Sequence, residues 1–563
     1  MTYVGATCAI TGLGFGSEAN YESLVRYKSG IVKYSQPQLC QFPLPLQRIE
    51  FTPNVDAPFE LTRLEKLMVL AINDVQKQTN QQAKLSGRIG LIISTTKGNI
   101  AMLNAQRPSN DSPIFLPNMA KRIAQVVDIQ TEPIIVSNAC TSGVAAIVVA
   151  SRLIRADMFD NIIVVGGDEC TDFTTSGFLA FKSVSSETCR PYDSHRDGVS
   201  LGEAAAAILV TNEKRRSTGF VLEGGAITND ANHISGPSRT GDALSFAIKE
   251  AMAQTNLTPE DISFINAHGT ATVYNDEMES KAMSLCDLSY VPLNSVKPYF
   301  GHTLGASGVL ETIMCIEEMR HSLLVGTLGF ERLGTSKMLI VSAEHRRIDA
   351  MRCLKTASGF GGTNAALVIA REDIAIAVNQ DVTPLGEPVS TCTISRGELS
   401  LNGKVIVHDV PQFETFIRNV YHRRNEPNMK FFKMDNLCKL GYIAANYIFE
   451  NQEFDEREVA VILSNRASSL DTDLQHAANL ASCRPASPAT FVYTLPNIVL
   501  GEISIHHKIK GETTFFVSER FDEDFMKRYA AILLARQQCR FVLVGWCELL
   551  ENQYDLKFYL YKK

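Results

Sequence analysis

A short apolar strand that ends in a cysteine and turns at once into a helix constrains the fold of this chain more than any other feature. Residues 134–136 (IIV) have the composition of a buried strand, and residues 143–150 (GVAAIVVA) that of a buried helix of small and branched side chains. Cys140 therefore lies on a strand-to-helix turn, where the free N–H groups and the dipole of the helix favour a thiolate. An inert buried cysteine is the alternative, and the sequence downstream decides between the two.

Short apolar segments alternate with helical ones along the first two thirds of the chain. The predicted strands are 4–14, 88–95, 161–167, 203–211 and 262–267, with two more within 353–369, and the predicted helices are 61–75, 116–127, 241–254, 276–285 and 305–319. This alternation predicts an α/β fold with buried sheets. The polar stretch 378–389 holds two prolines and is the best linker candidate, so we expect the first domain to end near residue 375.

Composition narrows the function classes. The net charge of −7 gives no support for nucleic-acid binding, although a local basic patch could still dock an acidic protein. The 13 cysteines contain no CxxC pair, which argues against a zinc module or a disulfide framework. No signal-peptide pattern opens the chain, and no apolar run approaches the roughly 18–20 residues that span a membrane. We therefore expect a cytoplasmic protein with reduced thiols and no metal site.

Three later motifs each place reactive groups at the end of a predicted strand. They are residues 266–272 (NAHGTAT), 295–302 (SVKPYFGH) and 358–364 (SGFGGTN). Each motif alone is weak evidence, because a histidine beside a glycine is usually a turn residue. Their combination with Cys140, in this order, is specific.

Together the motifs resemble the β-ketoacyl-[acyl carrier protein] synthases of the I/II type, which belong to the thiolase superfamily. The resemblance covers residues 2–372 and includes 189–193 (CRPYD), 196–198 (RDG) and 201–203 (LGE). Two histidines with one cysteine fit this branch, whereas a thiolase carries a second catalytic cysteine and a type III synthase an asparagine. The resemblance implies a five-layered αβαβα core over residues 1–375, in two halves of about 1–215 and 216–375.

By this resemblance, Cys140 carries the acyl group as a thioester, because a thiolate is both a nucleophile and a good leaving group. His268 and His302, as neutral imidazoles, would donate hydrogen bonds to the enolate that forms when a malonyl thioester loses CO2. The backbone N–H groups of Cys140 and Phe360 would form the oxyanion hole, with Phe360 also gating the acyl pocket. The neighbouring Gly359 and Gly361, with Gly362, would let the backbone approach the substrate closely.

The resemblance also assigns supporting roles. Lys297 is a structural cation that orders the site, paired with Glu279, and Asp276 and Glu279 support the site rather than act as acids or bases. Thr270 and Thr272 would bind the phosphopantetheine arm, which belongs to the carrier protein, so no dissociable cofactor is expected. Carrier-protein docking would use a set of cations for which a solvated helix face is an equally good interpretation: Arg63, Lys66 and Arg107.

The remaining residues, 376–563, contain no catalytic motif but echo the N-terminal half. The segment 458–464 (EVAVILS) matches 88–94 (RIGLIIS), and shorter matches on either side keep the same order. In this register Phe521 takes the position of Cys140, so the nucleophile is absent. Coincidence between two α/β segments is the alternative. The sharper hypothesis is a smaller α/β domain, a degenerate half-synthase that imitates a partner subunit, giving a homodimer or a pseudo-dimer.

The predicted function is decarboxylative Claisen condensation with an acyl carrier protein as partner. Two alternatives stay open: a non-condensing scaffold, similar to the chain-length factors that pair with active synthases, and a related acyl-thioester transferase or decarboxylase. The intact Cys140, His268 and His302 argue against the scaffold.

Overall fold

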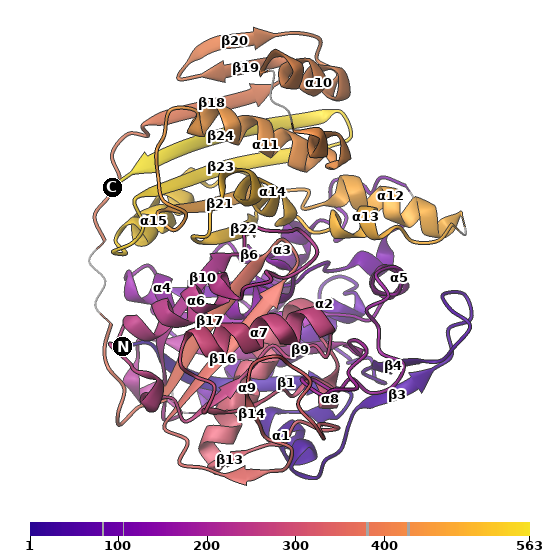
Figure 1. Ribbon diagram of the computed structural model, residues 1–563, viewed down its shortest axis with the longest axis vertical. Coiled ribbons are helices and arrows are strands. Elements are labelled where there is room, and N and C mark those ends of the chain that lie inside the picture. Colours follow the sequence, from indigo (N-terminus) through magenta and orange to yellow (C-terminus); the bar gives the residue numbers. More distant parts are fainter. Residues whose placement is uncertain (82–83, 105, 379–381, 425–427, 483) are drawn as a thin grey trace.

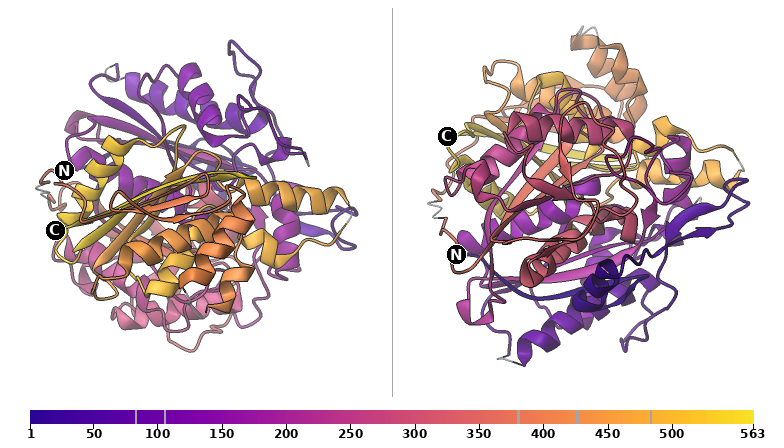
Figure 2. Two further views of the ribbon diagram at one scale, coloured as in Figure 1. Left: turned by 90° about the horizontal axis from the view of Figure 1, so that it is seen from above. Right: turned by 60° about the horizontal axis from the view of Figure 1, so that its bottom comes forward.

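The strand that precedes Cys140 lies in the middle of a sheet that runs through the whole molecule (Figure 1). The computed structural model describes residues 1–81, 84–104, 106–378, 382–424, 428–482 and 484–563. Figures 1 and 2 show the C-terminal region, coloured orange to yellow, stacked on one end of the first domain.

The first sheet of the N-terminal domain has mixed directions. Its strands, in spatial order, are β6 (Ile134–Val136), β5 (Ile89–Ser94), β7 (Asn161–Asp168), β9 (Ala204–Thr211) and β1 (Tyr3–Thr11). β5 is parallel to both β6 and β7, while β9 is antiparallel to β7 and β1. Helices on both faces bury the sheet, which explains why its strands are continuous apolar runs.

A second sheet continues from β1, whose Tyr3 and Val4 pair with the first residues of β10. Its strands, in spatial order, are β10 (Phe220–Asn229), β17 (Thr363–Arg371), β16 (Arg352–Gly359), β11 (Phe264–Asn266), β12 (Pro292–Asn294) and β14 (Ile340–Val341). β10 lies outside the predicted strands; its two consecutive glycines obscure the apolar pattern. Glycine is needed at one of them, because a Cβ on Gly224 would lie 2.0 Å from the carbonyl oxygen of Ala251.

Helices complete five layers. The outer pair on the first sheet is α2 (Arg63–Asn80) and α3 (Leu116–Val126), the central pair is α4 (Ser142–Arg155) and α9 (Ser307–His321), and the outer pair on the second sheet is α6 (Asp242–Ala253) and α7 (Val273–Leu285). The central helices cross with their backbones in contact, since a Cβ on Gly143 would lie 2.6 Å from the Val309 nitrogen. This packing explains the small residues after Cys140 and confirms the predicted αβαβα core.

Several shorter elements surround the layers, and no helix in the described part of the chain is long and apolar enough to cross a membrane. They are β2 (Gly14–Phe15), α1 (Ser17–Val25), β3 (Ile31–Tyr34), β4 (Leu44–Gln47), α5 (Asp172–Ala180), β8 (Leu201–Gly202), α8 (Lys297–Phe300), β13 (Leu323–Leu324) and β15 (Arg346–Arg347).

The C-terminal region forms a sheet covered by its own helices. Its strands, in spatial order, are β22 (Thr513–Val517), β21 (Val459–Asn465), β23 (Phe541–Leu550), β24 (Gln553–Lys562), β18 (Ser390–Ser395), β19 (Glu398–Leu401) and β20 (Lys404–His408). Its helices are α10 (Phe413–Arg424), α11 (Asn436–Phe449), α12 (Leu470–Ala481), α13 (Pro488–Val492), α14 (Ile498–His507) and α15 (Glu523–Leu534). The first five strands have the same order and directions as β6, β5, β7, β9 and β1.

The two sheets join edge to edge where β22 pairs antiparallel with β6. Val136 lies opposite Phe516 and Ile135 opposite Val517, and the Ser137 nitrogen donates to the Phe515 oxygen over 3.0 Å. The predicted linker includes residues 379–381, which lie outside the described residues. After them, Val382 and Leu385 pack against the apolar cluster that α15 shares with the sheet.

Candidate active site

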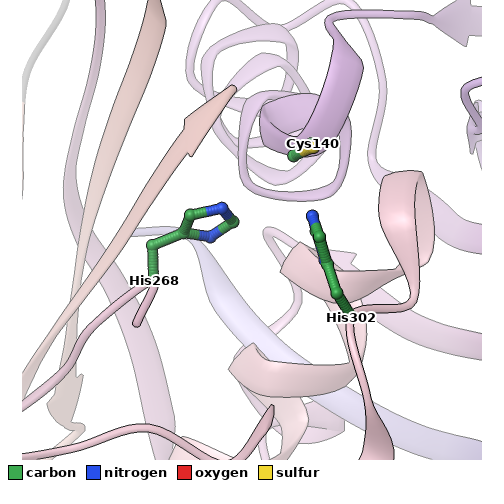
Figure 3. Close-up of side chains that lie close together, drawn as sticks. All are labelled: Cys140, His268 and His302. Atoms are coloured by element: carbon green, nitrogen blue, oxygen red, sulfur yellow. The ribbon is translucent and has the colours of Figure 1, made fainter. Parts of the chain in front are cut away.

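Three separate elements bring Cys140, His268 and His302 together (Figure 3). Cys140 lies in a 3-10 turn, η2 (Ala139–Thr141), between β6 and α4, while His268 follows β11 and His302 follows α8. One ligand-capable atom of each residue lies within 4.8 Å of the others, and the two imidazole rings meet edge to face with centroids 5.2 Å apart. The spatial cluster that the motifs imply is therefore present.

The turn at Cys140 is held by short-range hydrogen bonds. Ala139 has a φ of 48°, in the left-handed region, and the Ser142 hydroxyl donates to its carbonyl oxygen over 2.6 Å. Burial raises the pKa of Cys140 to about 12, and the nearby Lys297 ammonium offsets this only in part. In the resting site, burial therefore favours the protonated thiol over the thiolate.

Both histidines are held as neutral imidazoles. Burial, together with the positive charge of Lys297, lowers the pKa of each well below its usual value. His302 Nδ1 lies 2.9 Å from the Ser307 hydroxyl, which itself accepts from the Thr303 nitrogen and can therefore give its proton to Nδ1. The imidazole proton then lies on Nε2, a buried atom with no partner among the described residues. His302 is poised to donate a hydrogen bond to a bound ligand.

Lys297 is buried and lies 3.4 Å from His268 Nδ1, which gives that imidazole a cationic neighbour. Its ion pair is with Glu311 of α9, at 2.6 Å, and not with Glu279 as the sequence predicts. Lys355 pairs with the other oxygen of Glu311, also at 2.6 Å. Burial alone would raise the pKa of Glu311, but the two ammonium groups bring it below its ordinary value.

Glu279 and Asp276 accept hydrogen bonds from backbone groups at and near His268. Glu279 accepts hydrogen bonds from the His268 and Gly269 nitrogens, at 2.8 and 2.7 Å. Asp276 accepts from the Tyr192 nitrogen at 2.7 Å, and burial raises its pKa to about 7. Glu279 also accepts from the Tyr192 hydroxyl, so both carboxylates fix the same loop.

A cavity of about 370 Å³ opens over Cys140 and its two histidines. The hydroxyls of Thr270 and Thr272 lie 2.9 Å apart on its wall, where a polar arm could bind. Three phenylalanines form an aromatic part of its wall: Phe178, Phe181 and Phe360. Behind it lies Phe491 of α13, whose ring centroid is 5.8 Å from that of Phe178.

The glycine-rich turn between β16 and β17 lies close to the nucleophile. A Cβ on Gly359 would lie 3.0 Å from the Cys140 nitrogen. Gly361 has a φ of 85° and lies against the C-terminal region. A Cβ on Gly361 would lie 2.6 Å from the side-chain amide nitrogen of Asn497. That amide donates to the Phe360 carbonyl over 2.8 Å. The turn is therefore shaped from both sides.

The three predicted docking cations do not line the described wall of this cavity. Arg63 is half-buried and forms ion pairs with Glu169 and Glu203, at 2.6 and 2.7 Å. Arg107 pairs with Glu551 of the C-terminal region at 2.8 Å. Lys66 is partly exposed on α2.

The structure adds residues that the motifs miss, among them Glu311, Lys355, Ser307 and Asp168. Charged residues within apolar segments were the available signal: Glu311 interrupts the helix GVLETIM, and Lys355 the strand RCLKTAS. A buried charge requires a partner, but the sequence does not say which one.

Comparison with known proteins agrees with this geometry. The family "Beta-ketoacyl synthase, N-terminal domain" matches residues 68–216, and "Beta-ketoacyl synthase, C-terminal domain" matches residues 220–331. Residues 68–331 belong to the β-ketoacyl synthase family. The chain is 28% identical to 3-oxoacyl-[acyl-carrier-protein] synthase 2 of Coxiella burnetii in an alignment of 405 residues that covers 64% of this chain and 98% of that protein. It is 32% identical to the tetracenomycin ketoacyl synthase alpha subunit of Streptomyces glaucescens, over 46% of this chain and 64% of that protein.

Solved structures show the extent of the shared fold. A β-ketoacyl synthase from Burkholderia phymatum covers 66% of the chain and 99% of its own length, with a TM-score of 0.60 and 22% identity. A PfaC keto synthase–chain length factor covers 100% of the chain and 78% of its own length, with a TM-score of 0.80 and 13% identity. The fold similarity therefore includes the C-terminal region as well as the synthase.

Proposed function

We propose that this synthase condenses an acyl group on Cys140 with malonyl-[acyl carrier protein], giving a 3-oxoacyl-[acyl carrier protein] in fatty-acid, polyketide or polyene synthesis. The observation that carries the proposal is His302 Nε2, a buried atom without a partner among the described residues that lies beside His268 and Cys140. Two neutral imidazole donors next to a cysteine can stabilise the negative oxygen of an enolate, which forms in the condensation and does not form in thioester hydrolysis.

The first step loads the enzyme. The Cys140 sulfur attacks the carbonyl carbon of an acyl thioester carried on phosphopantetheine, and the new C–S bond forms as the bond to the carrier's sulfur breaks. The oxyanion formed on the way would accept hydrogen bonds from the Cys140 and Phe360 nitrogens. The two turns that carry them lie close together, since a Cβ on Gly359 would lie 3.0 Å from the Cys140 nitrogen. The thiol proton leaves with the departing pantetheine sulfur.

The second step forms the carbon–carbon bond. The bond to the malonyl carboxylate breaks, CO2 leaves, and the electron pair becomes an enolate whose oxygen accepts from His268 and His302. The enolate carbon then attacks the acyl carbonyl, and Cys140 leaves as a thiolate that regains a proton. Because both imidazoles stay neutral near pH 7, they donate throughout. One such donor contributes about 3–4 kcal/mol.

For the C-terminal region we propose the role of a second subunit, as a degenerate half-synthase without a nucleophile. Its first five strands repeat the order of the synthase's first sheet, and Phe521 lies between β22 and α15, as Cys140 lies between β6 and α4. Its strand β22 reaches the nucleophile turn directly: Asn138 donates to the Thr513 oxygen over 2.9 Å and accepts from the Phe515 nitrogen over 2.7 Å.

The last strand of this region is less buried than its counterpart in the synthase. β9 is buried along its whole length, whereas its counterpart β24 alternates buried residues with exposed ones such as Lys557. Such alternation is typical of a sheet with one solvated face. This sheet therefore has a water-facing side in the described residues.

Intact-protein mass spectrometry with acyl-[acyl carrier protein] of graded chain length tests the function. We expect an acyl adduct on the wild type and none on Cys140→Ala, and product analysis with acyl and malonyl donors together should give the 3-oxoacyl product. A decarboxylated or transferred product without chain extension would instead support a transferase or decarboxylase. No adduct on a folded protein would support the scaffold.

A further inference from the structure

Lys97 connects the C-terminal region to the loop that carries His302. This lysine follows β5, and its side chain is almost completely buried between the synthase and α12. Its ammonium donates to Asp473 at 2.6 Å, to the Ser469 hydroxyl at 3.1 Å and to the Thr494 carbonyl at 2.5 Å. All three acceptors belong to the C-terminal region, so the synthase by itself leaves this charge without them.

The backbone of the same segment is tied to Asp168 at the end of β7. Asp168 accepts from the nitrogens of Thr96 and Lys97, at 2.9 and 3.3 Å, and from the Thr95 hydroxyl at 2.9 Å. The carboxylate is 2% exposed, so these donors replace water entirely. The position of Asp168 therefore depends on segment 95–97.

Asp168 in turn holds the turn that follows His302. The Gly305 nitrogen donates to the carboxylate over 2.7 Å, in η5 (Leu304–Ala306), three residues after the histidine. The turn also rests directly on the same segment, because a Cβ on Gly305 would lie 2.8 Å from the Thr95 Cα. A shift of residues 95–97 would consequently move the turn that begins at His302.

We propose that Asp473 is a positioning residue for His302, acting through Lys97 and Asp168. The C-terminal region thus helps to fix the position of His302, in addition to covering the edge of strand β6. Without the ion pair between Lys97 and Asp473, segment 95–97 is no longer anchored to the C-terminal region by the only ion pair described for Lys97. The activity test below rests on the proposed function, whereas the exchange test does not.

The test compares Lys97→Met, Asp473→Leu and the double variant with wild type. Each single variant leaves a buried charge unpaired and should unfold at a lower temperature than the wild type, while the double variant replaces the pair by apolar side chains and should recover most of the stability. If the pair positions the histidine turn, the double variant stays about 10- to 100-fold slow in malonyl-[acyl carrier protein] decarboxylation, because a misplaced donor loses rate steeply. Cys140 acylation should change by less than about threefold.

Hydrogen–deuterium exchange supplies a readout independent of catalysis. We expect faster exchange in peptides that contain Gly305 in the double variant, with unchanged exchange in β16. The matched control is Arg152→Met, which removes another buried ion pair between the two regions, with Glu512 at 2.7 Å. This control should lose stability without changing the ratio of decarboxylation to acylation.

Recovery of both stability and decarboxylation in the double variant would overturn the proposal, as would unchanged exchange at Gly305. An equal fall of both partial reactions would also overturn it, since that indicates a general loss of folding. If the wild type shows neither partial reaction, the proposed function fails, and the exchange result alone decides whether Asp473 positions the turn.

Discussion

Val136, four residues before the nucleophile, pairs antiparallel with Phe516 near the other end of the chain. The edge that β6 would otherwise expose is therefore already filled from within the same chain. An unpaired edge strand is a ready site for another strand, so filling it decides how this protein can assemble.

We predict that the full chain is a monomer in solution, with the 62.0 kDa mass of one copy. Light scattering coupled to size exclusion measures this directly. Deleting residues 376–563 would expose β6 and should give dimers or aggregates. A full-length protein with twice the mass would show that a second copy binds somewhere other than the β6 edge or displaces β22.

Replacing Asn138 by alanine removes the two hydrogen bonds that its side chain makes with β22. It leaves the Thr513 oxygen and the Phe515 nitrogen unpaired in the protein interior, which should cost about 1–3 kcal/mol of unfolding free energy for each group. Thermal unfolding measures the loss, and Cys140 acylation should slow as well. Asn212→Ala is the control, because Asn212 is exposed and should change stability by less than about 0.5 kcal/mol. Equal effects of the two variants would contradict the role of Asn138.

Truncating Phe491 to alanine should let longer acyl groups load onto Cys140. The ring backs the aromatic wall of the cavity, and it fills the space that a Cβ on Gly177 would need, at 2.2 Å. The change costs about 3–5 kcal/mol of stability, as for other buried aromatic truncations. Competition between acyl chain lengths, read by intact mass, reports the shift.

Phe454→Ala is the matched control for that experiment. Phe454 belongs to the same region but packs on Phe449 and Phe541, outside the cavity wall. It should leave chain-length preference unchanged. An unchanged preference in Phe491→Ala would place the end of the acyl pocket elsewhere.

The thiol of Cys140 should react slowly near neutral pH and accelerate as the pH rises. Its pKa of about 12 keeps it protonated, so the thiolate fraction grows about tenfold per pH unit until the pH nears that value. Iodoacetamide labelling of the Cys140 peptide between about pH 7 and 9 should follow this slope. Lys297→Met, which removes the neighbouring cation that lowers the pKa, should slow labelling further. A plateau below pH 9 would show that the resting thiol is far more acidic.

Local sequence determined the layers and the identity of the chemistry. Apolar runs of strand length separated by amphipathic segments specify buried sheets and helices, and the cysteine and histidine motifs lie at strand ends, where a sheet gathers them at one edge. The αβαβα core and the cluster of Cys140 with His268 and His302 follow from that. β10 escaped prediction because Gly224 and Gly225 serve packing against neighbours that a linear pattern does not contain.

Only the tertiary structure decided how the charges pair and what the C-terminal region touches. Lys297 can reach either Glu279 or Glu311 in principle, and the choice of Glu311 depends on how α9 packs beside α8. The raised pKa of Cys140 follows mainly from burial, which depends on how the layers pack around the thiol. Lys97 and Asp473 are 376 positions apart in the sequence. A pattern of neighbouring residues cannot predict a contact over that separation.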